Sequence, residues 1–256
     1  MKLSIAHWHG NCLISFVMKK TSTIIAITSG LFFGQAQAEI ESEFHVGYNS
    51  EYIYRGFELG KDAYEYGLDF AGSSDCGLDW SAGIWSISPD GGADDELDIY
   101  ASVSKDLGIG SVAAGFTVYT YDEPATADDA EVYLGFSTQK AGLDLGLTVF
   151  FGTDGALQDA VLLEGSIGYS FEVSSKTTAN IGIVYGTLLD EGDLSDDGEL
   201  YASASISLDY AVSDNITFSP YVSYSDGDED IIEAPGSTST AADGVLFGGA
   251  SVSISF

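Results

Sequence analysis

The feature of this chain that most constrains its fold is an alternation of apolar and polar residues with a period of two. It recurs in twelve stretches between residue 39 and the C-terminus. In the stretch 64–70, tyrosine, leucine and phenylalanine alternate with Glu65, Gly67 and Asp69. Successive side chains of a β-strand point to opposite faces. Each stretch therefore predicts a strand with one apolar face and one small or acidic face.

The connections between these stretches alternate in length. The longer ones carry most of the loop acids, and they are Pro89–Glu96, Asp122–Asp129, Gly152–Asp159, Thr187–Gly198 and Asp226–Gly244. The shorter ones lie near Lys105 and at Lys140–Gly142, Glu172–Lys176 and Ala211–Asp214. An even number of strands with short turns at one end and longer loops at the other is typical of outer-membrane barrels. A different parsing of the weak stretch Gly110–Tyr121 would change the strand count by two.

A soluble β-sandwich shows the same alternation, because it buries one face of each sheet. Two features favour a membrane barrel instead: strands of about ten residues or more, and aromatic residues near strand ends. The residues expected in the interfacial girdles are Tyr119, Tyr121, Phe150, Phe151, Tyr169 and Phe171. The sequence therefore predicts an all-β fold, a closed antiparallel transmembrane barrel of about twelve strands, over residues 39–256.

Residues 1–38 have the pattern of an export signal. Lys19 and Lys20 precede an apolar run, and the small residues at 36–38 suit cleavage near Ala38, before Glu39. Met18 is an alternative start. The apolar run is short for a transmembrane anchor, the other interpretation. These features predict export to the bacterial outer membrane.

The charge of the remaining chain excludes some partners. Removing residues 1–38 leaves five of the eight lysine and arginine residues against all 40 acids, a net charge near −35. Such a chain repels nucleic acid. Cys76 is then the one cysteine, so no intramolecular disulfide forms, and no cofactor is expected. The expected partners are outer-membrane lipid and lipopolysaccharide, small ions or polar solutes, and the barrel assembly machinery, through the C-terminal Phe256.

Acidic residues on the polar faces of the predicted strands indicate a charged lumen. Arg55, the single arginine, lies on the polar face of its strand. The apolar Ile53 on that face is an exception. The lumen or constriction candidates are Arg55, Glu51, Glu65, Asp69, Asp98, Glu131, Asp144, Glu164 and Glu199; a wider set adds Asp79 and Asp209. Charged side chains that face lipid are costly, so the position of these acids on one face of each strand itself favours a polar interior.

Two roles for Arg55 follow. It either forms a charged constriction with neighbours such as Glu65 or Asp69, or makes a structural ion pair that pins two strands. No long loop has the pattern of an inward-folded constriction. The acidic segment Asp226, Asp228 and Asp230 has the spacing of the first ligands of a calcium loop, but lacks its glycine and final glutamate. It predicts a solvated acidic loop, with weak calcium binding as the alternative.

The segment Gly47–Gly60, with its run Tyr52-Ile53-Tyr54-Arg55-Gly56, resembles the N-terminal hallmark of the TorF family of outer-membrane porins. The later pieces 82–85, 96–100, 131–135 and 164–169 are similar in kind to that family. The resemblance implies an outer-membrane barrel with pore activity, and it supplies no catalytic residues.

An enzyme is not expected. His45 is the one histidine after residue 38, on the predicted periplasmic half, and no nucleophile elbow or phosphate loop is present. The sequence predicts a passive channel for ions or small polar solutes that prefers cations. The alternative is a non-conducting structural or adhesive barrel whose acidic outer loops bind divalent cations.

Overall fold

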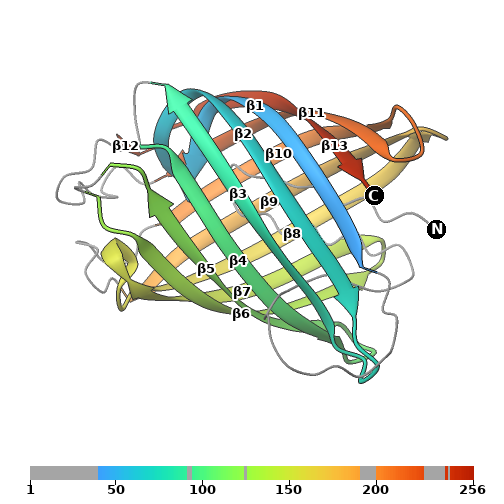
Figure 1. Ribbon diagram of the computed structural model, residues 1–256, viewed down its shortest axis with the longest axis horizontal. Helices are drawn as coiled ribbons and strands as arrows, with labels where there is room; N and C mark the ends of the chain where they lie inside the picture. The colour runs from blue at the N-terminus through green and yellow to red at the C-terminus, as the bar shows by residue number, and fades with distance from the viewer. Residues whose placement is uncertain (1–39, 91–93, 124–125, 191–199, 228–239, 242) are drawn as a thin grey trace.

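The computed structural model describes residues 40–90, 94–123, 126–190, 200–227, 240–241 and 243–256. Twelve long strands form the wall of one antiparallel barrel (Figure 1). They are β1 (Glu41–Tyr54), β2 (Phe57–Ser73), β3 (Asp79–Asp90), β4 (Glu96–Asp106), β5 (Ser111–Tyr121), β6 (Asp129–Lys140), β7 (Leu143–Asp154), β8 (Val161–Ser174), β9 (Thr177–Asp190), β10 (Leu200–Ala211), β11 (Ile216–Gly227) and β13 (Val245–Ser255). A short 3-10 helix, η1 (Gly155–Leu157), follows β7, and a two-residue strand, β12 (Thr240–Ala241), precedes β13.

The barrel closes between its first and last strands. β1 pairs with β2 on one side, where Glu43 lies opposite Asp69, and with β13 on the other, where Glu43 lies opposite Ser255. Every other wall strand pairs with its neighbours along the chain. Closure removes the free edges that an open sheet would present. The predicted twelve-stranded antiparallel barrel is confirmed.

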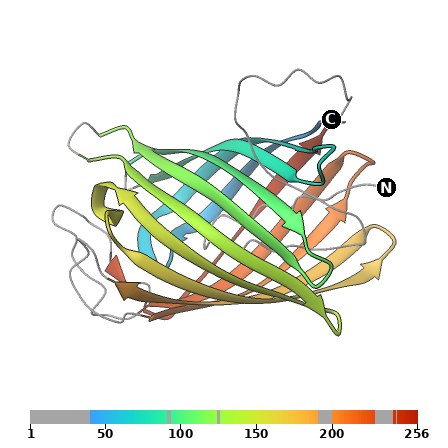
Figure 2. The same cartoon turned by 90° about the horizontal axis from the view of Figure 1, so that it is seen from below.

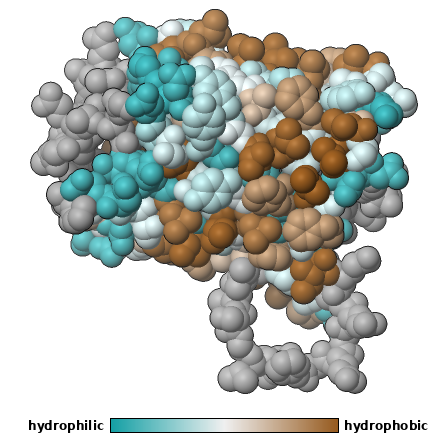
Figure 3. Space-filling view, turned by 45° about the horizontal axis from the view of Figure 1, so that its top comes forward, coloured by the Kyte–Doolittle hydropathy of each residue, from teal (hydrophilic) through white to brown (hydrophobic). Residues whose placement is uncertain are grey.

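The wall has an apolar outer face and a polar inner face. On β2, Tyr64 and Tyr66 are 66% and 54% exposed, whereas Glu65 and Asp69 between and beyond them are buried. The same alternation continues around the barrel, with exposed residues such as Ile99, Leu134 and Ile183. Figure 3 shows apolar side chains gathered on the wall and hydrophilic ones toward its left end. An outward apolar band is what lipid chains require of a barrel.

Three of the expected girdle aromatics face inward instead. Phe151, Tyr169 and Phe171 are exposed on the outer face, as predicted, but Tyr119 and Phe150 are buried, and Tyr121 lies half-buried on the same face of β5 as Tyr119. Strand parity explains the difference. Tyr119 shares its face of β5 with the buried Ser111, so both side chains point into the lumen.

The connections divide between the two ends of the barrel, as predicted. Residues 74–78, 107–110, 141–142, 175–176 and 212–215 make short turns at the end that holds the C-terminus. The longer connections join strands at the opposite end, called here the loop end (Figure 1). In the part of the chain that the structure describes, no helix has the length and apolar character needed to cross a membrane.

The β1–β2 hairpin leaves the wall at the loop end. The pairing of β1 with β2 shifts register between Tyr52 and Ile53, and the pairing of β2 with β3 reaches only Lys61. At the register shift, the side chains of the adjacent residues Tyr52 and Ile53 are both buried, at 3% and 0% exposure, although they point to opposite faces. Residues 52–60 are called the hairpin tip, and Figure 2 shows the light-blue tip curled inside the barrel. Continued alternation along β1 would place Tyr52 on the outer face with Tyr48, but Tyr52 is buried because both faces of the tip contact protein.

Candidate functional site: a constriction in the lumen

A two-residue turn places Arg55 at the end of the hairpin tip. Arg55 and Gly56 have φ angles of 48° and 86°, and they separate the paired residues Tyr54 and Phe57. Consecutive positive φ angles are the mark of a type I′ hairpin turn, which suits the twist of paired strands. The left-handed conformation costs arginine roughly 1–2 kcal/mol relative to glycine. Contacts of the Arg55 side chain must offset this cost.

The Arg55 guanidinium forms a bidentate ion pair across the barrel. Its Nη1 and Nη2 lie 2.8 Å and 2.9 Å from Oε2 and Oε1 of Glu131 on β6. Its Nε lies 3.8 Å from Oε2 of Glu164 on β8. Arg55 is therefore paired with an acid, as expected, but its partner is Glu131 rather than Glu65 or Asp69. The predicted partners were wrong because the tip crosses the lumen, which brings β6 and β8 closer to Arg55 than β2.

Aromatic side chains complete the surroundings of this guanidinium. Its Cζ lies 4.2 Å from the ring centre of Phe150 and 4.8 Å from that of Tyr54, a range in which ring faces attract cations. Tyr119 donates a hydrogen bond of 2.8 Å to Glu131, and its hydroxyl also lies 2.8 Å from that of Tyr54. Tyr201 donates one of 2.6 Å to Glu164. The phenols therefore fix the two carboxylates toward Arg55.

Other parts of the tip touch further strands. The Tyr52 hydroxyl lies 3.0 Å from both carboxylate oxygens of Glu96 on β4, and its ring packs edge-on against Trp85 of β3. A Cβ added to Gly56 would lie 2.7 Å from Cβ of Tyr201. The backbone of β12 pairs with residues 57–58. The tip thus spans the lumen from β3 to β10. A strand hairpin, rather than a long loop, narrows the lumen, and the sequence did not indicate this.

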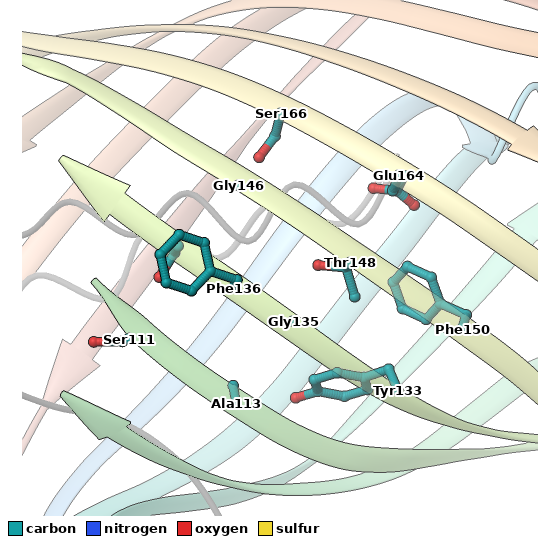
Figure 4. Close-up of a pocket in the computed structure, with 11 residues that line it drawn as sticks. Ser111, Ala113, Tyr133, Gly135, Phe136, Gly146, Thr148, Phe150, Glu164 and Ser166 are labelled. Atoms are coloured by element: carbon teal, nitrogen blue, oxygen red, sulfur yellow. The ribbon is translucent and has the colours of Figure 1, made fainter. Parts of the chain in front are cut away.

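A cavity lies in the lumen on the turn-end side of the constriction. It follows the inner face of β5 to β8 (Figure 4). Phe150 and Glu164, which border the Arg55 contact, also line the cavity. Most of the other lining residues are small or polar: Ser111, Ala113, Gly135, Ser137, Gly146, Thr148 and Ser166. Small inward residues leave the space that larger ones would fill.

The remaining predicted lumen residues do not converge on Arg55. Glu65 accepts a hydrogen bond of 3.2 Å from Asn49. Asp69 accepts one of 2.5 Å from Tyr100, and its Oδ2 lies 3.5 Å from Nδ1 of His45.

The other candidates occupy separate positions. Asp98 is buried, Asp144 is half-buried beside Gln139, and Glu51 lies 3.4 Å from the exposed Lys61. Glu199 lies outside the described residues. The lumen is therefore lined by acids at several levels, and only Glu131 and Glu164 meet the arginine.

The set of candidate lumen residues was incomplete. Glu43 and Glu96 are buried acids on the same strand faces as His45 and Asp98, so alternation places both of them inside the barrel. Nothing in the sequence indicated that Tyr52 would contact Glu96, 44 residues away. Such pairs depend on how the tip folds inward.

Serine hydroxyls give the rest of the inner wall a polar surface. Those of Ser102, Ser203, Ser223 and Ser225 are buried and have no hydrogen-bond partner among the described residues. Buried hydroxyls are normally bonded to protein or to water. Four such groups on the inner faces of β4, β10 and β11 favour a hydrated lumen.

The calcium candidate lies mostly beyond the described residues. Asp228 and Asp230 fall in the segment 228–239, and Asp226 is exposed, with its Oδ1 accepting a hydrogen bond of 3.1 Å from the Gly244 amide. Among the residues with described structure, no group of three or more histidine, cysteine, aspartate or glutamate side chains is placed to hold a metal ion.

Comparison with known proteins shows which solved structures share this architecture. No protein-family model and no curated protein sequence matches the chain. Solved structures do match it: a KdgM porin with a TM-score of 0.51 and 14% identity, over 84% of this chain and 99% of that one. The barrel has the fold of outer-membrane porins.

Two further solved structures agree. A NanC porin matches with a TM-score of 0.50 and 13% identity, over 84% of this chain and 98% of that one. The COG4313 outer membrane channel from Pseudomonas putida F1 matches with a TM-score of 0.51 and 10% identity, over 86% and 95%. All three of these matches are porins or channels, and at such identities the likeness concerns the fold. Membership of the TorF family stays a prediction.

Proposed function

We propose that this protein is a passive channel of the bacterial outer membrane that carries small cations and small polar solutes through an acidic lumen. The observation that carries the proposal is the pairing of an apolar outer wall with a polar inner one, along which a cavity lies. A barrel built only for structure gains more stability by filling its interior with apolar side chains than by leaving it open. The fold shared with porins supports the same assignment.

Cation preference follows from the charges on the inner wall. Seven buried carboxylates line it, and they are Glu43, Glu65, Asp69, Glu96, Asp98, Glu131 and Glu164. Arg55 is the one arginine available to balance them. Carboxylates in a low-dielectric wall attract cations and repel anions. The mechanism is diffusion through a hydrated lumen, in which charge and diameter set selectivity.

The proposed partners follow from the same surface. Lipid covers the outer wall, lipopolysaccharide surrounds the loop end, and the strand that ends in Phe256 is the element that the barrel assembly machinery recognises. The export signal at residues 1–38, with cleavage near Ala38, belongs to this proposal. No catalytic role is assigned.

The hairpin tip favours a second candidate, a non-conducting barrel. The tip crosses the lumen at the loop end, and a permanent plug there would leave the acidic loops as the functional surface, for adhesion or divalent-cation binding. The two candidates differ in one measurable property, because only a channel carries current.

The deciding experiment is the reversal potential of the protein, purified from outer membranes, in a planar bilayer under a tenfold potassium chloride gradient. A channel with an acidic lumen gives discrete current steps and a potential on the cation-selective side. The substitutions Glu65→Gln and Asp69→Asn should move that potential toward zero. A folded barrel that never conducts, with or without its hairpin tip, establishes the second candidate.

A further inference from the structure

The Arg55 contact has the composition of a receptor site for an organic cation. One carboxylate, Glu131, holds the guanidinium by two parallel hydrogen bonds, and a second, Glu164, approaches its Nε. The ring of Phe150 faces the same group at 4.2 Å. Paired carboxylate oxygens match the fork of a guanidinium, and aromatic faces attract cations.

The wall supplies most of this site without help from the hairpin tip. Glu131, Phe150 and Glu164 lie on the adjacent strands β6, β7 and β8, near the loop end and on the inner face. Tyr119 and Tyr201 donate to the two carboxylates and hold them in place. The site is therefore preorganised by regular wall strands, and only the cation comes from elsewhere.

These two carboxylates need a cation. Glu131 and Glu164 are 3% and 5% exposed. A buried charge without a counter-charge is strongly unfavourable, whereas a paired one is tolerated. Any occupant must bring a positive charge and several donors, which a guanidinium does and a spherical potassium ion does not.

The present occupant is attached to an element that has left the ladder of wall strands. The β2 residues before Lys61 do not pair with β3, and Arg55 has a positive φ, which is unfavourable for its backbone. Glu164 and Phe150 border both the Arg55 contact and the cavity of Figure 4. A solute in the lumen thus reaches the same groups that hold the tip.

We infer that Arg55 is a tethered ligand in a site for guanidinium-bearing solutes, and that such solutes displace it and open the lumen. The inference rests on the proposed channel function. It names a substrate class for the channel, small alkylguanidinium compounds, and it makes the hairpin tip the element that their binding releases.

The first test measures current through wild type, Arg55→Ala and the control Lys61→Ala. Lys61 lies on the same hairpin and carries the same charge, but it is 60% exposed and pairs only with Glu51 and Glu58 in the described structure. The fraction of time spent open should rise at least about tenfold in Arg55→Ala, equivalent to about 1.4 kcal/mol, and stay unchanged in Lys61→Ala. Millimolar ethylguanidinium chloride should open wild type, and tetramethylammonium chloride should not.

The second test measures binding without current. Titration calorimetry on detergent-solubilised Arg55→Ala should detect ethylguanidinium, because the site on the wall is vacant. Adding Glu131→Gln should weaken that binding at least about tenfold, since the neutral amide keeps only one of the two acceptor oxygens and loses the negative charge. Folding of each variant is checked by its heat-modified gel migration, and Arg55→Gln replaces Arg55→Ala where the latter does not fold.

The outcomes separate the two proposals. Equal open fractions in wild type and Arg55→Ala, with no ethylguanidinium binding, overturn the inference and leave a conducting barrel as a channel. Binding of ethylguanidinium in a barrel that never conducts overturns the channel function and the role of the tip in opening it. Opening by tetramethylammonium as readily as by ethylguanidinium overturns the guanidinium specificity.

Discussion

At the scale of single residues, the Arg55–Glu131 pair sits where both charges have left bulk water. Arg55 is 7% exposed, and its partner is nearly covered. Each charge therefore depends on the other, and the bidentate geometry strengthens the pair relative to a single contact. Exposed ion pairs of this protein, such as that of Lys61 with Glu58, lack this dependence because water competes with the partner.

Replacing Glu131 by glutamine should destabilise the barrel. The change keeps the side-chain volume but removes the charge opposite a buried guanidinium, and we expect the free energy of unfolding to fall by about 2–3 kcal/mol. Urea unfolding in lipid vesicles measures it. The matched control is Glu58→Gln, which breaks an exposed pair and should leave the unfolding midpoint unchanged. An equal effect of both substitutions would show that burial does not matter here.

Gly56→Ala should push the hairpin tip off the wall. Alanine at φ 86° pays the left-handed backbone cost, about 1 kcal/mol, and its Cβ would meet Tyr201 at 2.7 Å. Gly77→Ala is the control, since its φ is 71° with nothing within 4 Å of an added Cβ. Bilayer recordings should show a higher open fraction in Gly56→Ala only. A matching rise in Gly77→Ala would assign the effect to backbone strain.

Strand parity predicted which residues face the lumen but not which of them meet. The inward positions of Glu65, Asp69, Glu131 and Glu164 follow from alternation, because a one-residue error would place charges in lipid. The partner of Arg55 lies 76 residues away on a strand that is not its neighbour. No local pattern encodes such a contact, so its identity required the three-dimensional fold.

At the scale of elements, the β1–β2 hairpin is where sequence reasoning failed. Its alternation continues into the tip, so the pattern predicted a wall strand throughout. The inward bend of the hairpin depends on a register shift between Tyr52 and Ile53. The one local sign of this bend in the sequence is the apolar Ile53 on the otherwise polar face of the strand. Ile53 packs with Phe247 of β13 inside the barrel, so an apolar side chain on the inner face has an apolar neighbour there.

The positions of the turns and loops predict how the barrel is oriented in the outer membrane. Cys76 is exposed in the β2–β3 turn, at the end expected to face the periplasm, and a hydrogen bond with Ser74 lowers the pKa of its thiol, which favours the reactive thiolate. A polyethylene-glycol maleimide, too large for the lumen, should label Cys76 only after the outer membrane is permeabilised.

The control for this labelling places the thiol at the other end. Glu123→Cys in a Cys76→Ser background puts a thiol in the β5–β6 connection, at the loop end. It should react in intact cells. The reverse pattern of labelling would show that the barrel is inserted with its loops toward the periplasm.

At the scale of the whole molecule, the fold followed from the sequence because lipid leaves few choices. A chain that crosses a membrane with strands must pair every backbone group, and only a closed barrel does so. Alternation, strand length and strand number then determined the architecture, and solved porins at 10–14% identity share it. The cavity along β5 to β8 could not be predicted, since the space left in the lumen depends on how far the tip enters.

Selectivity should weaken with salt. The acids of this chain act on permeant ions partly at a distance, and the Debye length shrinks from about 10 Å at 0.1 M to about 3 Å at 1 M. We expect the reversal potential at a fixed tenfold gradient to fall as the mean potassium chloride concentration rises over that range. A potential independent of concentration would mean that direct contact at the constriction, rather than the field of the whole wall, selects the ion.

The position of the tip near the beginning of the chain has a consequence for assembly. Arg55 precedes every strand that its side chain touches across the lumen, and the seal between β1 and β13 uses the last residues of the sequence. Contacts between distant segments form late, because the chain between them must first be ordered. The arginine contact joins residues 76 positions apart, whereas the seal joins Glu43 to Ser255, 212 positions apart. The hairpin tip therefore docks on β6 before the first and last strands meet, and the lumen is narrowed before the ring closes around it.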